Sequence, residues 1–205
     1  MNVHSVDGVT IYCGDNVSVM RDLPSESIDL TVTSPPYDNL RTYGGHSWDF
    51  EGVAEQLARV TKQGGVIVWV VADATIDGSE TGTSFRQALY FMSLGLNLHD
   101  TMIYRKPGTV CVTQIRYYQV FEYMFVLSKG APVAWNPIQV KTTGHGGTTV
   151  GSRRRGTAKE MTSQRNEYRN ADNVWDVLPG VNGSDVHGLM HVAPFPESLA
   201  SDHIL

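Results

Sequence analysis

Cysteine is scarce in this chain, and the cysteines that occur form none of the patterns that bind metals or build disulfide frameworks. Only Cys13 and Cys111 are present among 205 residues, with no Cys-x-x-Cys pair and no histidine at metal-ligand spacing. Isolated cysteines of this kind are typical of buried free thiols. The sequence therefore predicts no metal site and no structural disulfide.

Long hydrophobic runs are also lacking. The longest apolar stretch covers residues 65–72, far short of the roughly 20 residues that a membrane span needs. The first residues, MNVHSVDG, do not have the basic-then-apolar order of a secretion signal. At 41% hydrophobic content the chain can bury one sizeable core. We therefore expect a cytoplasmic protein with one main domain.

The chain does not carry the general excess of basic residues that coats many nucleic-acid-binding proteins, since its net charge is −5. The charge is unevenly distributed, however. Residues 141–170 hold seven Lys and Arg against two Glu, a net charge of +5, which leaves −10 for the rest of the chain. This asymmetry predicts an anion-binding segment. The alternative is a solvated, disordered basic loop. Both interpretations hold together if the loop is disordered when free and becomes ordered when it binds phosphates.

A Thr-Ser-Pro-Pro-Tyr stretch at residues 33–37 carries the clearest chemical signal. It follows an apolar, β-branched run over residues 27–32, so the prolines fall where a buried strand must stop. Two prolines hold two φ angles near −65° and remove two N–H donors, which leaves a stiff turn rich in acceptors. With the Ser34 hydroxyl and the Tyr37 ring, this turn suits a planar substrate whose exocyclic amine must be held. A turn that merely closes the strand is the alternative.

Hydrophobic periodicity predicts alternating strands and helices along the chain. Helices are expected over residues 16–23, 50–62 and 85–92, and strands over residues 9–13, 27–32, 66–71, 96–104 and 121–127. In the third helix the expected apolar face consists of Phe85, Ala88, Leu89 and Met92. The first strand, helix and strand imply a crossover into a parallel sheet, in which ligands bind at the carboxyl ends of the strands.

The order of motifs along the chain resembles the β-class amino-directed DNA methyltransferases. The residues that carry the resemblance are Gly14-Asp15, Leu23-Pro24, residues 27–30, the 33–37 motif and Tyr43-Gly44. Enzymes of this class transfer methyl from S-adenosylmethionine to N4 of cytosine or N6 of adenine. The resemblance implies an α/β, Rossmann-like methyltransferase sheet that is mostly parallel with one antiparallel strand. It also implies duplex DNA as the substrate and a bacterial or phage-infected cell as the setting.

The resemblance further implies a set of site residues. The catalytic residues would be Ser34, Pro35, Pro36 and Tyr37, and the cofactor site would include Asp15, Thr33, Ser34 and Phe195. Phe195 belongs to a His-x-Ala-x-Phe-Pro-x-x-Leu segment that starts at residue 191. Asp15 is equally well explained as the cap of the helix that follows it. Serine before the two prolines is more typical of the cytosine-N4 branch than of the adenine-N6 branch.

Periodicity is lost between residues 135 and 173, where Gly, Thr, Ser and Arg dominate. We interpret residues 135–173 as a target-recognition insert that binds DNA, set into a catalytic core of residues 1–134 and 174–205. Arginine suits both phosphates and guanine edges. The candidate DNA contacts are Arg105, Lys106, Arg116, Arg153, Arg154, Arg155 and Lys159. For Arg105, Lys106 and Arg116 the alternative is that they are surface residues of an edge strand without a role in DNA binding.

A glycine-rich loop of the Asp-Pro-Phe-x-Gly-Ser-Gly-Thr type, which the family uses to hold the cofactor, has no counterpart with the required strand-loop-helix setting. We therefore expect a sheet that is incomplete at the C-terminal end. A second polypeptide, or self-association, would complete the sheet, because an open edge exposes apolar surface and unpaired backbone. A catalytically incomplete DNA-binding subunit is thus an alternative to the enzyme.

The basic segment leads to a direct prediction. Neutralising Arg153, Arg154 and Arg155 together should weaken DNA binding and flatten its salt dependence, because each lost phosphate contact lowers the slope of log K against log salt by about 0.9. The measurement is DNA affinity across a salt series for the parent and the triple variant. An unaltered slope would assign this loop to another role.

Overall fold

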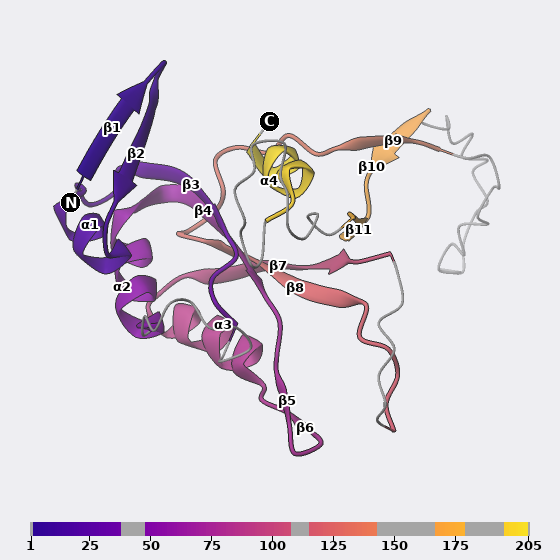
Figure 1. Ribbon diagram of the computed structural model, residues 1–205. Coiled ribbons are helices and arrows are strands. Elements are labelled where there is room, and N and C mark those ends of the chain that lie inside the picture. The colour runs from indigo at the N-terminus through magenta and orange to yellow at the C-terminus, as the bar shows by residue number, and fades with distance from the viewer. Residues whose placement is uncertain (1, 38–47, 108–114, 143–166, 179–194, 205) are drawn as a thin grey trace, which may run out of the picture. The chain divides into compact units, whose positions relative to one another are not determined.

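The computed structural model describes five stretches of the chain, whose helices and strands are labelled in Figure 1. They are residues 2–37, 48–107, 115–142, 167–178 and 195–204. The chain divides into two compact units, one made of Met1–Trp135 and Asn173–Leu205, the other of Asn136–Asp172. In the smaller unit, β9 (Gln139–Lys141) pairs antiparallel with β10 (Tyr168–Asn170).

The larger unit is built on a five-stranded sheet. Two of its strand pairs are parallel, whereas β8 runs antiparallel to both of its neighbours. Four strands therefore share one direction and one is reversed, which confirms the predicted mostly parallel sheet with one antiparallel strand. The strands, in sheet order, are β11 (Val174–Asp176), β7 (Asn97–Arg105), β8 (Phe121–Ser128), β4 (Thr61–Val71) and β3 (Ile28–Thr33).

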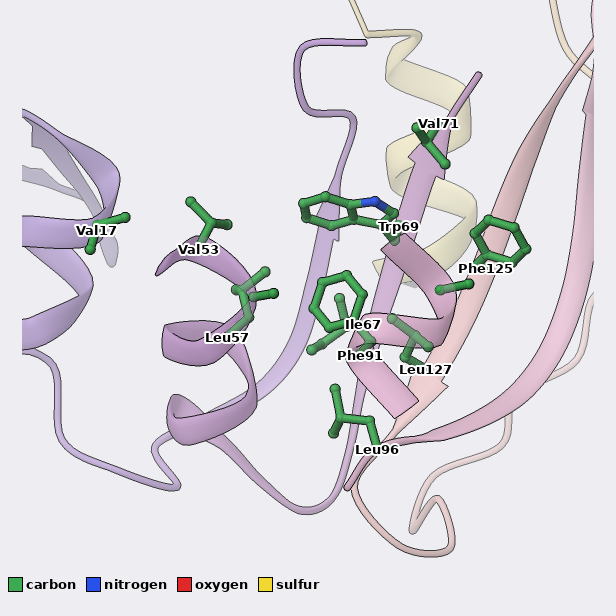
Figure 2. Close-up of a cluster of buried hydrophobic side chains, with 12 residues drawn as sticks. Val17, Val53, Leu57, Ile67, Trp69, Val71, Phe91, Leu96, Phe125 and Leu127 are labelled. Atoms are coloured by element: carbon green, nitrogen blue, oxygen red, sulfur yellow. The ribbon is translucent and has the colours of Figure 1, made fainter. Parts of the chain in front are cut away.

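β4 is buried on both faces, as expected of a central strand in a sheet with helices on each side. Ile67, Trp69 and Val71 alternate along one face and pack with residues of α1 (Asn16–Asp22), α2 (Phe50–Val60) and α3 (Thr83–Ser93). Figure 2 shows Trp69 beside Phe91 of α3 within this cluster. Their ring centroids are 5.1 Å apart in an edge-on arrangement, a geometry that adds to the burial energy of aromatic side chains.

The opposite face of the sheet carries the second core cluster. Val68 and Val70 alternate with the first set along β4 and pack with Leu199 of α4 (Glu197–Ile204), which is fully buried. Trp175 of β11 joins this cluster and stacks on His203 of α4. The helix at the end of the described chain thus covers the face of the sheet that α1, α2 and α3 leave open.

The third helix forms where it was predicted and buries Ala88 as expected, but the other three residues of the predicted buried face are wrong. Phe85, Leu89 and Met92 are 50%, 64% and 44% exposed. The buried side chains of α3 are instead Ser84, Gln87, Ala88 and Phe91. Periodicity could not separate two faces that both carry apolar residues. The face that is buried carries Gln87, whose side-chain oxygen accepts the buried Trp69 indole N–H at 2.9 Å. Without this acceptor the indole N–H would be buried and unpaired, which is costly.

The strand over residues 9–13 was predicted to lie in the same parallel sheet as the strand over residues 27–32. This prediction is wrong, because the strand forms a separate hairpin instead. β2 (Val9–Cys13) pairs antiparallel with β1 (Asn2–Val6) and is not part of the five-stranded sheet. The turn is Asp7-Gly8, with φ values of 49° and 83°, and Asp-Gly is a strong sequence signal for a hairpin. All residues of both strands are exposed. Cys13 is accordingly an exposed free thiol, not a buried one, and Cys111 lies outside the described residues.

The remaining strands of the larger unit are short. β5 (Thr75–Ile76) and β6 (Ser79–Glu80) form a small hairpin between β4 and α3. Asp73 precedes it and is buried, with Oδ1 accepting from the Ser84 backbone N–H at 2.8 Å and Oδ2 from its hydroxyl at 2.6 Å. Asp73 therefore anchors the start of α3. Within the described stretches, no helix is both long and apolar enough to span a membrane.

The corrected face of α3 predicts a sharp contrast between two variants of one helix. Phe91→Ala should lower the free energy of unfolding by about 3–5 kcal/mol, because it opens a cavity beside Trp69. Leu89→Ala should change it by less than about 0.5 kcal/mol, because the side chain is already largely in solvent. Urea unfolding of both variants measures the difference. Equal losses of unfolding free energy in the two variants would contradict the burial of the Phe91 face over the Leu89 face.

Candidate active site

The predicted motif lies at the carboxyl edge of the sheet. β3 ends at Thr33, which pairs with Trp69 of the parallel strand β4, and residues 34–37 continue beyond the strand end. Pro35 is buried, and neither Pro35 nor Pro36 has an N–H to donate. The turn is therefore stiff and anchored, and it holds Ser34 and Tyr37 at the position where parallel sheets bind ligands.

Two further segments reach the same edge. β8 is reversed, so its first residues, Phe121 and Glu122, pair with the last residues of β7, Arg105 and Tyr104. Lys106 follows directly after β7, and its N–H donates to the Val120 carbonyl at 2.7 Å. The strand directions alone thus bring Glu122 and Lys106, which are distant in sequence from the motif, to the edge that carries Ser34 and Tyr37.

Hydrogen bonds join these residues into one chain of polar contacts. Ser34 Oγ lies 2.5 Å from Tyr37 Oη. Tyr37 donates its hydroxyl proton to Glu122 Oε2 at 2.7 Å. Lys106 Nζ in turn donates to the other carboxylate oxygen, Glu122 Oε1. A serine, a phenol, a carboxylate and an ammonium are therefore connected in sequence.

Glu122 is the buried charge at the centre of this chain. Its side chain is 10% exposed, whereas that of Lys106 is 37% exposed. A carboxylate removed from water to this extent requires both hydrogen bonds and charge compensation, and Tyr37 and Lys106 supply them. Lys106 Nζ also lies 5.7 Å from the ring centroid of Tyr104, within the range of a cation–π contact.

Both tyrosines of the cluster remain protonated at ordinary pH. Burial, and then the negative charge of Glu122, raise the pKa of Tyr37 far above its usual value of 10. The same two causes raise the pKa of Tyr104 to about 12. Tyr37 is thus a neutral phenol that gives its only hydroxyl proton to Glu122.

A family profile described as DNA methylase matches residues 28–205. This match includes the Ser34 turn, β7, β8 and α4. The chain belongs to the DNA methylase family. Residues 2–13, which form the hairpin, lie outside the matched region.

Curated relatives of this chain are themselves named as methyltransferases. It is 48% identical over 191 residues to the orphan methyltransferase M.BamHII of Bacillus amyloliquefaciens, covering 87% of this chain and 71% of the relative. It is 33% identical over 106 residues to the type II methyltransferase M.BglII of Bacillus subtilis, covering 47% of this chain and 29% of that protein. The chain thus spans less than the full length of these relatives.

The fold also matches a solved structure. The chain aligns with PvuII DNA methyltransferase (cytosine-N4-specific) at a TM-score of 0.61 and 18% identity, covering 94% of this chain and 68% of that one. At this identity the likeness concerns the fold. It agrees with the predicted α/β, Rossmann-like methyltransferase architecture.

The predicted cofactor residues occupy three different settings. Asp15 caps α1, where its Oδ1 accepts from the Ser18 N–H at 2.8 Å, and the hydrogen bonds from Ser18 lower the pKa of its carboxyl. Thr33 and Ser34 lie at the end of β3. Phe195, just before α4, is half-buried against the core cluster around Leu199. The helix-cap interpretation of Asp15 is therefore confirmed, and its cofactor role stays a prediction.

The predicted DNA-contacting residues that the structure describes are engaged in ion pairs. Arg105 donates to both carboxylate oxygens of Asp176 on β11 in a bidentate ion pair. Arg116 pairs with Glu80 at 3.3 Å and donates to a backbone carbonyl of the β5–β6 hairpin. Lys106 belongs to the Glu122 cluster. The candidates Arg153, Arg154, Arg155 and Lys159 lie outside the described residues.

Glu122 is the site residue that sequence analysis missed. A signal was present, because Glu122 is the one acidic residue within the apolar strand of residues 121–127. Acidic side chains are seldom buried without a partner, so a glutamate in an apolar strand predicts a hydrogen-bonding or basic partner for its carboxylate. The sequence could not indicate which residue that partner would be, since Tyr37 is 85 positions away.

The raised pKa of Tyr37 predicts a pH dependence of stability. The folded state holds the phenol proton above pH 10 and the unfolded state releases it, so this contribution is present below pH 10 and is lost as pH rises. The free energy of unfolding should fall by up to about 1.4 kcal/mol per pH unit from this residue. Tyr37→Phe should remove that part of the slope. Urea unfolding of parent and variant between pH 9 and 11 tests this, and parallel curves would contradict it.

Proposed function

We propose that this chain catalyses methylation of an exocyclic amine of a base in duplex DNA, with cytosine N4 favoured and S-adenosylmethionine as the methyl donor. The observation that carries the proposal is the strand-end turn of a DNA methylase, in which Ser34 and Tyr37 are linked to a buried carboxylate. The turn offers fixed acceptors and a fixed ring, which are the groups that an amine on a planar base requires.

The amine is a poor nucleophile because its lone pair is delocalised into the ring. Acceptors that hold both of its N–H bonds favour a pyramidal nitrogen whose lone pair points away from the ring. Ser34 Oγ and the Pro35 carbonyl oxygen are the acceptors in this proposal. The anchored turn supplies them in a set geometry, and positioning of this kind accounts for much of the rate enhancement of a direct transfer.

Tyr37 has a second part in the proposal, as the ring on which the base stacks. Its hydroxyl is tethered at 2.5 Å to Ser34 and 2.7 Å to Glu122, so the ring needs little further ordering. The base must leave the duplex to reach this site, because its amine is otherwise paired. Stacking on an aromatic side chain compensates for part of the lost base stacking.

The chemistry of the chain's own residues fits S-adenosylmethionine. Asp15 offers an exposed, ionised carboxylate for hydroxyl or amine groups, Thr33 and Ser34 lie at a ligand-binding strand end, and Phe195 offers an apolar surface beside α4. When bound, this cosubstrate would supply an electrophilic methyl group on a sulfonium, whose S–C bond would break as the N–C bond forms, with the thioether leaving and one amine proton passing to solvent. The chain's contribution is to orient the amine.

Adenine N6 is the alternative target within the same proposal. The preference for cytosine rests on serine at position 34, which replaces the acidic or amide residue common in the adenine branch. The identity of the methylated nucleoside decides between the two bases.

A catalytically incomplete DNA-binding subunit is a second candidate function, and one observation favours it. Among the residues that the structure describes, β3 hydrogen-bonds only to β4, and β2 only to β1. The hairpin also exposes Val6, Val9 and Ile11. Such edges pair readily with other strands, so a second polypeptide, or a second copy, would complete the sheet. In this reading the predicted insert at residues 135–173 and the basic candidates bind DNA.

Methyl transfer by the purified 205-residue chain tests the proposal. Labelled S-adenosylmethionine and unmodified DNA are incubated with the chain, and the nucleosides are identified by mass spectrometry. N4-methylcytosine is the expected product, and N6-methyladenine would identify the alternative base. Absence of product, together with retained DNA binding, would support the incomplete subunit.

Ser34→Ala sharpens the same assay. The variant should lower the single-turnover methylation rate at least tenfold, because one acceptor for the amine is lost. It should leave duplex affinity within about twofold, because the hydroxyl is not expected to contact phosphate. Ser201→Ala, in α4, where the hydroxyl donates only to the Ser198 carbonyl at 3.1 Å among the described contacts, is the matched control. An unchanged rate for the first variant would remove Ser34 from the chemistry.

A further inference from the structure

The direction of the hydrogen bonds at the site is determined by Glu122. A carboxylate can only accept hydrogen bonds, and Tyr37 donates to Glu122 Oε2 at 2.7 Å. A phenol has a single hydroxyl proton, so Tyr37 has none left for Ser34. The 2.5 Å contact between the two hydroxyl oxygens therefore requires Ser34 to donate to Tyr37.

This direction has a consequence for Ser34. A serine hydroxyl has one proton and two acceptor lone pairs. With its proton directed to Tyr37 Oη, the remaining capacity of Ser34 Oγ is that of an acceptor. An exocyclic amine presents N–H donors, so an acceptor is the partner it requires. If the chain of hydrogen bonds ran the other way, Ser34 would have a proton free to face the amine.

We propose that Glu122 is a positioning residue, held by Lys106, which sets Tyr37 as donor and thereby makes Ser34 an obligatory acceptor for the amine of the target base. This inference rests on the proposed function for its substrate, whereas the hydrogen-bond direction rests on the contacts among Ser34, Tyr37 and Glu122 alone. Glu122 acts through Tyr37 and Ser34 and does not itself touch the base.

Burial and charge make Glu122 suited to this task. Its side chain is 10% exposed, so water seldom competes for the oxygen that accepts from Tyr37. Lys106 donates to the other carboxylate oxygen, compensates its charge and restricts its rotation. A matched pair elsewhere lacks these features, since Tyr90 contacts Glu55 at 3.4 Å on the exposed surface between α2 and α3.

The hydrogen-bond direction can be measured without any methylation. A fluorinated tyrosine, more acidic than tyrosine, is incorporated at position 37 of the full chain, and its ¹⁹F shift is followed against pH. Glu122→Gln should lower the titration midpoint, because the nearby negative charge that opposes the phenolate is removed. Glu55→Gln should leave the midpoint unchanged.

Ser34→Ala in the fluorinated chain then tests the second bond. A donor from Ser34 stabilises the phenolate and lowers the pKa of Tyr37, so its removal should raise the midpoint. If Ser34 were instead the acceptor, the same variant would lower the midpoint. Opposite shifts for Glu122→Gln and Ser34→Ala therefore support the inference. A fall of the midpoint in Ser34→Ala, or no shift in Glu122→Gln, overturns it.

Single-turnover methylation completes the test. Glu122→Gln, which keeps the size of the side chain, should lower the rate at least tenfold with duplex affinity within twofold, whereas Glu55→Gln should match the parent. An active parent with an equally active Glu122→Gln variant would overturn the positioning role alone. An inactive parent would count against the proposed function, while the ¹⁹F shifts would still decide the direction of the hydrogen bonds.

Discussion

The reversed direction of β8 is the constraint on which the site depends. Because β8 runs opposite to the other four strands of the sheet, it begins at the edge where β3, β4 and β7 end. A parallel β8 would place Glu122 at the opposite edge, roughly 20 Å away at about 3.3 Å per residue. The contact between Glu122 and Tyr37, and with it the polar chain from Lys106 to Ser34, exists only because one strand is reversed.

The two core clusters hold this edge in place. β4 lies between β3 and β8 and is packed on both faces, with Trp69 and Phe91 on one side and Val70 and Leu199 on the other. Close packing of this kind leaves little freedom for the strands to shift. The Pro-Pro turn extends that order past the end of β3, because its φ angles have almost no range. A stiff turn on a stiff sheet fits the proposed role, in which two acceptors must be presented accurately to an unreactive amine.

The chain matches a known family and a known fold, yet some of its described strands have an edge without a partner. The profile of the DNA methylase family covers residues 28–205, and the chain spans 71% of the length of M.BamHII. Within the described stretches, β3 and the β1–β2 hairpin each have an edge without a partner strand. The residues proposed to orient the amine lie in the turn after β3, in β8 and directly after β7.

By itself the sequence determined the local elements and the motif. The strand-length run before Ser34, the two prolines and the period of each helix depend on neighbouring residues, and each predicted element was found near its expected position. The Asp7-Gly8 hairpin was equally local and could have been predicted from its turn residues. Only the tertiary structure decided which face of α3 is buried and that Glu122 accepts from Tyr37. Both depend on the order and direction of strands that are far apart in sequence, and periodicity within one segment carries no information about what packs against it.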